Sequence, residues 1–140
     1  MGPGVWAAVC CGCAGLPDWP AEGEPTMPWV REAVEWRLKR GLDDCGEAVP
    51  AVDAWTLAWL AGAPDVHVDI RTAEWPFLAV APTLLPVLAQ SLTLSALDGS
   101  DTRNLSAEDR REAVRRVKRV AHRTSGFMTP ELRRAFRASR

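Results

Sequence analysis

Residues 66–71 read Val-His-Val-Asp-Ile-Arg, so three β-branched apolar side chains alternate with three polar ones. Strict alternation is typical of a strand with one face on the core and the other in water. A strand needs a partner, and residues 55–60 lie just across the turn-like segment 61–65. We therefore expect a hairpin, although Trp55 and Trp59 are also four apart, as on one face of a helix.

Helical patterns flank this hairpin on both sides. Thr26 can cap a helix over residues 28–40, where apolar side chains recur at helical spacing. A second apolar pattern covers residues 83–95, where Pro86 is tolerated only in the first turn. We expect one helix in each segment.

The ends of this pattern are less regular. Residues 4–11 are short and apolar, which fits a buried strand but leaves a helix open. Residues 91–97 alternate and can end the layout as a last strand. The order of these expected strands and helices predicts an α+β fold of βαββαβ type. A small antiparallel sheet carries helices on one face, and basic C-terminal helices follow it. An all-α bundle is the alternative.

The composition fits one domain. The chain has 140 residues, 47% of them hydrophobic, and a net charge of −1. No apolar run reaches the roughly 18 residues of a bilayer-spanning helix, because prolines interrupt residues 75–97. Residues 1–14 lack the basic start of a secretory signal. We expect an intracellular protein that has no membrane partner.

Charge divides the chain into two parts. Residues 1–102 hold five basic and fourteen acidic side chains, which gives a net charge of −9. Residues 103–140 hold twelve basic and four acidic side chains, which gives a net charge of +8. This predicts an acidic core domain over 1–102 and a basic helical extension over 103–140, with helices that begin near Ser106 and Thr129. The extension supplies the predicted contacts to a partner or to nucleic acid: Arg111, Arg115, Lys118, Arg119, Arg133, Arg134 and Arg137.

Three roles for this basic extension are open. It can bind nucleic acid, bind an acidic protein, or pair with the acidic part of its own chain. We expect the last of these, because Glu108, Asp109 and Glu112 interrupt the basic surface.

The cysteines give a weak metal signal. Cys10 and Cys13 have zinc-knuckle spacing, but Cys45, His67 and His122 stand singly in unrelated segments. We expect no metal, no cofactor and buried reduced thiols.

No catalytic motif is recognisable either. His67, Asp69 and Arg71 share the polar face of the predicted strand, yet no nucleophile elbow and no phosphate-binding glycine loop accompany them. We expect a protein without enzyme activity.

Seven tryptophans are many for a small core. Trp19, Trp29 and Trp75 lie beside prolines, and exposed tryptophan is enriched at contact surfaces. They predict an interface and a dimer or larger assembly, with gap-filling in the core as the equal alternative.

Residues 66–71, followed by an apolar helix that runs through residues 91–94 to Asp98, resemble the central strand and second helix of the adenovirus early-region-four open-reading-frame-three family. Residues 30–40 are similar to that family's first helix. The resemblance covers residues 30–98 and implies a βαββαβ-like dimer that assembles further in the infected nucleus and reorganises host nuclear proteins. The chain departs from the family around residues 85–87, which lack its assembly asparagine, and in its basic extension.

The resulting hypothesis is a self-associating interaction protein without enzyme activity, of the kind a virus uses early to capture host proteins. It would act in the host nucleus if viral and otherwise in the cytoplasm. The alternative is a nucleic-acid-binding accessory protein that acts through its basic C-terminal helices.

Overall fold

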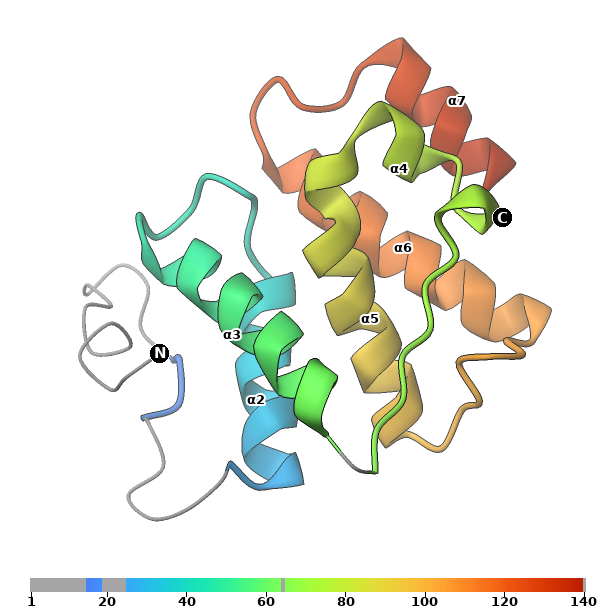
Figure 1. The fold of residues 1–140 in the computed structure, drawn as a ribbon. Helices are drawn as coiled ribbons and strands as arrows, with labels where there is room; N and C mark the ends of the chain where they lie inside the picture. The colour runs from blue at the N-terminus through green and yellow to red at the C-terminus, as the bar shows by residue number, and fades with distance from the viewer. Residues whose placement is uncertain (1–14, 19–24, 64, 140) are drawn as a thin grey trace.

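The fold is that of a computed structural model, which describes residues 15–18, 25–63 and 65–139. The longer helices are α2 (Met27–Leu38), α3 (Ala48–Gly62), α5 (Leu85–Leu97), α6 (Ala107–Arg123) and α7 (Pro130–Ala138). Between α3 and α5 lie η2 (Thr72–Glu74), the short helix α4 (Phe77–Val80) and η3 (Pro82–Leu84) (Figure 1). None of these described helices is long and apolar enough to cross a membrane.

Hydroxyl caps start three of the helices. The side chains of Thr26, Ser106 and Thr129 each accept a hydrogen bond from the backbone N–H three residues further on. Such a bond satisfies one of the amides that the first helical turn leaves unpaired. The predicted helix starts at these positions are confirmed.

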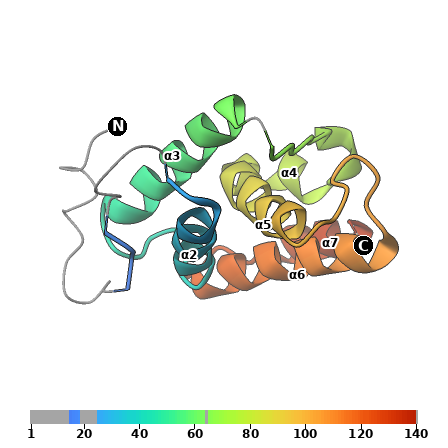
Figure 2. The ribbon, with the colours of Figure 1, turned by 90° about the horizontal axis from the view of Figure 1, so that it is seen from below.

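Helix α5 is the centre of the packing. Its residues 87–95 are all buried, and it contacts α2, α3 and α6. Helix α6 forms an outer layer beneath α2 and α5 (Figure 2), and α7 packs on α4, where the rings of Phe77 and Phe136 stack with centroids 4.9 Å apart. Buried side chains of α6 and α7 belong to the same core as those of α2, α3 and α5. Charge, rather than packing, therefore distinguishes residues 103–140.

The predicted sheet is wrong. No strand occurs in residues 15–18, 25–63 and 65–139, and the all-α alternative fits instead. Residues 55–60 belong to α3, where Trp55 and Trp59 stack with ring centroids 6.1 Å apart. Residues 91–97 belong to α5, whereas residues 4–11 lie outside the described part of the chain.

The alternation in residues 66–71 has another cause. Val66 is buried and Val68 and Ile70 are partly buried against the helices, while the three polar side chains between them are exposed. The segment runs from α3 towards α4 without strand pairing (Figure 1). An alternating pattern indicates that one side of an extended segment is buried. In this protein, helices bury that side. The βαββαβ fold implied by the adenoviral resemblance is therefore not the fold of the described residues.

A buried polar network joins three helices. Arg37 of α2 is fully buried, and its Nε lies 2.6 Å from Oδ1 of Asp53 on α3. Nε2 of Gln90 on α5 donates to the same Asp53 oxygen at 2.7 Å. A carboxylate shared by two donors from two helices holds α2, α3 and α5 in one relative arrangement.

Candidate functional site

Helix α6 is strongly amphipathic. Its apolar side chains at Val114, Val117 and Val120 are buried. The opposite side carries basic residues at spacings of three, four and seven, which share one side of a helix. The α6 basic face consists of Arg111, Arg115, Lys118, Arg119 and His122.

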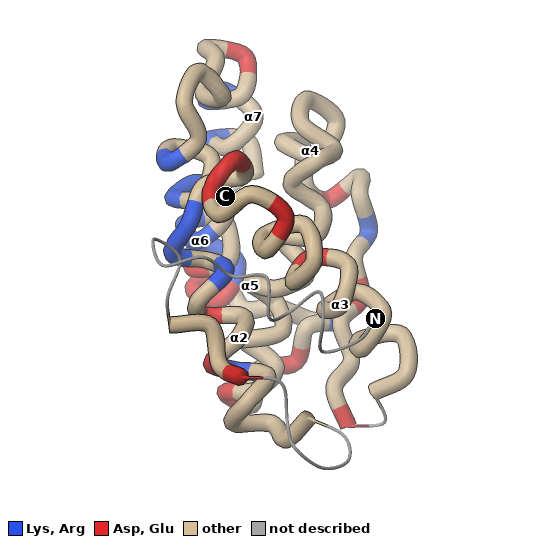
Figure 3. The backbone as a smooth tube through the Cα atoms, turned by 90° about the vertical axis from the view of Figure 1, so that its left-hand side faces the viewer, with Lys and Arg blue, Asp and Glu red and all other residues tan. Residues whose placement is uncertain are grey.

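Helix α7 continues the basic surface. Leu132 and Phe136 face the core, and Arg133, Arg134 and Arg137 are exposed. Figure 3 shows the Lys and Arg positions along α6 and again at α7. Of the seven predicted contact residues, Lys118 is partly buried and the other six are exposed.

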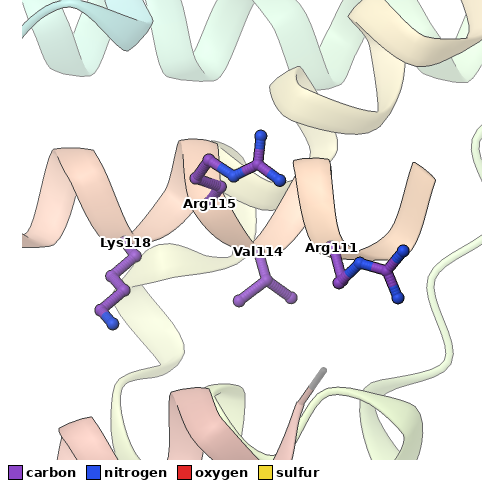
Figure 4. Close-up of a pocket in the computed structure, with 4 residues that line it drawn as sticks. All are labelled: Arg111, Val114, Arg115 and Lys118. Carbon is purple, nitrogen blue, oxygen red and sulfur yellow. The ribbon is translucent and has the colours of Figure 1, made fainter. Parts of the chain in front are cut away.

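One flank of the α6 basic face is hollow. Arg111, Val114, Arg115 and Lys118 line a pocket of about 260 Å³. Figure 4 shows Arg111 and Lys118 extending to opposite sides of Val114. No carboxylate belongs to this lining within the described residues, so an anion entering it meets cations and one apolar side chain.

The other flank holds a second hollow of about 160 Å³. Residues of α2, α5 and α6 line it: Glu35, Leu38, Lys39, Leu94, Arg116, Arg119 and Arg123. The protein fixes two of these guanidinium groups, because Nη1 of Arg116 donates to the Ser91 carbonyl at 2.9 Å and Nη1 of Arg123 to the Leu38 carbonyl at 2.7 Å. Lys39 and Arg119 are exposed beside them.

The sequence prediction missed this second hollow. A spacing of three and four residues places Arg116, Arg119 and Arg123 along one side of the helix. This second basic side could have been found from the sequence. Lys39 comes from α2 and joins them only through tertiary packing.

The seven predicted basic side chains do not pair with the acidic part of the described chain as expected. Within the described residues, the salt bridges of α6 run from Arg115 and Arg116 to Glu112 of the same helix, at 2.5 and 3.5 Å. None of the seven predicted residues forms a salt bridge to a carboxylate of the described acidic part. In the part of the chain that the structure describes, apolar packing and hydrogen bonds from Arg116 and Arg123 to backbone carbonyls attach α6 to the rest of the molecule.

The structure contradicts one of the three predicted tryptophan surface positions, that of Trp75. Trp75 is only 2% exposed, beneath the guanidinium of Arg110, whose Cζ lies 4.2 Å from the ring centroid. The surface position predicted for it is therefore wrong. Trp29 is partly buried, and its Nε1 donates to the Asp18 carbonyl at 2.7 Å. Trp19 lies outside the described residues.

The metal and catalytic candidates do not converge either. The described residues contain no cluster of three or more His, Cys, Asp or Glu side chains that could hold a metal ion. Cys10 and Cys13 lie outside them, and Cys45 is disulfide-bonded, so the expected reduced thiol is wrong for Cys45.

His67 and Asp69 are exposed on the extended segment 66–71. The nearby Arg71 places its Nε 3.8 Å from Oδ2 of Asp69, a surface ion pair.

No protein-family model, no curated protein and no solved structure matches this chain.

Proposed function

We propose that this chain is a nucleic-acid-binding protein without enzyme activity, and that the solvent side of α6 and α7 is its contact surface. The observation that supports it is the set of seven basic side chains on two successive helices, unpaired with the acidic part of the described chain. Cations that neutralise phosphates release counterions, which supplies most of the affinity of such surfaces.

The form of the surface favours a phosphate polymer over an acidic protein. Helix α6 has 17 residues and is about 25 Å long, so its cations suit a ligand with regularly repeated charge. Arginine forks match phosphate oxygens in a bidentate way. Protein interfaces depend on buried aromatic or aliphatic anchors, and the exposed side of α6 carries none.

The acidic residues elsewhere do not prevent binding. Charges separated by more than about 8 Å are largely screened at physiological salt. Glu112 is already paired with Arg115 and Arg116, and Glu35 lines the second hollow beside Arg119. With such a partner, we propose that the protein acts inside a cell, in the host nucleus if it is viral and otherwise in the cytoplasm.

A titration of labelled DNA duplex with the full chain tests the proposal. We expect binding to weaken by on the order of a thousandfold between about 50 and 200 mM salt if six or more phosphates are contacted. The variant Arg111→Gln/Arg115→Gln/Arg119→Gln should bind far more weakly while its circular dichroism stays that of the native protein.

The matched control is Arg71→Gln, which removes an exposed, ion-paired arginine from outside the α6 basic face. Its affinity should equal that of the unaltered chain. Binding that does not change with salt, or tighter binding to polyglutamate than to duplex, would overturn the proposal in favour of an acidic protein partner or no charged partner.

A further inference from the structure

The two hollows lie on opposite flanks of α6. Successive residues of an α-helix are turned by about 100°, which places Arg111 and Lys118 on one side of Arg115 and places Arg119 and Arg123 on the other. The crest between the flanks is Arg115 and His122, both exposed. Helix α6 is thus a ridge with a hollow along each side. Cations and Val114 line the first hollow, and cations together with Glu35, Leu38 and Leu94 line the second.

We propose that this ridge enters the major groove of B-form DNA, and that its two flanks contact the phosphates of the two different strands. This inference rests on the proposed function and names the ligand of that same site. A helix with its side chains is about 10–12 Å across and the B-form major groove is about 12 Å wide. Helix α6 lies in the outer layer of the molecule, away from α3 (Figure 2), so its crest is accessible to such a groove.

Each flank offers cations to one strand. On the first flank, Arg111 and Lys118 stand beside the pocket of about 260 Å³ (Figure 4). On the second, Lys39 and Arg119 stand beside the hollow of about 160 Å³, with Arg123 fixed by the Leu38 carbonyl. The hollows leave space beside the helix, which the two phosphate rims of a groove require.

The crest side chains suit base edges. Arginine is the side chain that most often contacts guanine O6 and N7 in the major groove. Arg115 pairs with Glu112 at 2.5 Å, yet 54% of its side chain is exposed, so it is accessible to a base edge.

The same dimensions exclude other forms of nucleic acid. The B-form minor groove is about 6 Å wide, too narrow for a helix. The major groove of an RNA duplex is deep and narrow and cannot be read by side chains. A single strand has one backbone and would use one flank at a time.

Binding of the full chain to a DNA duplex, an RNA duplex and a DNA single strand of the same sequence tests this at one salt concentration. We expect the DNA duplex to bind tightest, with hydroxyl-radical protection of both strands across one major groove. Arg111→Gln/Lys118→Gln should remove protection from one strand and Lys39→Gln/Arg119→Gln from the other. The logarithm of the binding constant falls linearly with the logarithm of the salt concentration. Each double substitution should make this slope shallower by about 1.8, the value for two phosphate contacts.

Equal binding of the three nucleic acids would overturn the groove model but leave the proposed function standing. The same follows if both double variants reduce protection equally on both strands. Failure of all three nucleic acids to bind would instead overturn the proposed function itself.

Discussion

Asp53→Asn tests the buried network that joins α2, α3 and α5. The substitution keeps the size of the side chain but removes the charge facing the fully buried Arg37, 2.6 Å from its Nε. At an effective dielectric constant of about 20, unit charges about 4 Å apart attract by about 4 kcal/mol. Asp53 keeps 18% of its side chain exposed, so solvent reduces this, and leaving a buried cation unpaired costs about 3–5 kcal/mol. We expect a loss near 3 kcal/mol.

Urea unfolding followed by far-UV circular dichroism measures this loss. The control is Glu35→Gln, the same carboxylate-to-amide change in a pair with Arg31 at 3.9 Å whose side chains are 36% and 46% exposed. An exposed pair of this kind contributes about 0–1 kcal/mol. Arg37→Met combined with Asp53→Leu should cost less than the sum of the two single changes. If Asp53→Asn unfolds at the same urea concentration as the unaltered chain, the network does not stabilise the fold.

Three further outcomes are expected. Gly41→Ala should destabilise the protein because a Cβ there would lie 2.7 Å from the Arg123 carbonyl oxygen, whereas Gly62→Ala, with nothing within 4 Å, should raise the free energy of unfolding by up to about 1 kcal/mol. Phe136→Ala should cost about 3–5 kcal/mol, because that ring is 1% exposed and stacks on Phe77, and the exposed Arg137→Ala should be nearly neutral in the same denaturation experiment. Sedimentation should show at least a dimer at tens of micromolar if the exposed Met27 and Leu57 belong to a self-association surface, and a pure monomer would contradict self-association.

The helix starts and the α6 basic face could be predicted because both depend on local spacing. Thr26, Ser106 and Thr129 cap helices by bonding to amides three residues away. The spacing of Arg111 and Arg115 follows from the helical period alone. Such signals need no knowledge of tertiary structure.

The partners of a covered surface could not be predicted. The alternation of residues 66–71 correctly indicates one buried side, but a sheet and a layer of helices cover that side equally well. Trp75 lies beside a proline, as edge residues do, yet it belongs to the core. It lies beneath the guanidinium of Arg110, 35 positions later, and its ring centroid is 6.2 Å from that of Phe77. The second hollow likewise depends on Lys39, which α2 brings to α6 from a distant part of the sequence.

Arg119→Gln should move stability and binding in opposite directions. Arg119 stands four residues from both Arg115 and Arg123, and like charges at that spacing destabilise a helix by about 0.2–0.5 kcal/mol per pair. We therefore expect the variant to be more stable by about 0.4–1 kcal/mol at low salt, with the difference lost near 1 M salt, where the Debye length is about 3 Å. Its DNA affinity should fall, and the salt slope should decrease by about 0.9.

Glu112→Gln is the matched opposite. It removes the acid that pairs with Arg115 and Arg116, so the helix should lose stability while the released guanidinium groups bind phosphate more tightly. If the repulsion between cations along α6 serves binding and lowers stability, Arg119→Gln should raise the free energy of unfolding and Glu112→Gln should lower it. If Arg119→Gln lowers stability and affinity together, Arg119 supports the fold, and the loss of binding reports damage to the helix instead of a lost contact.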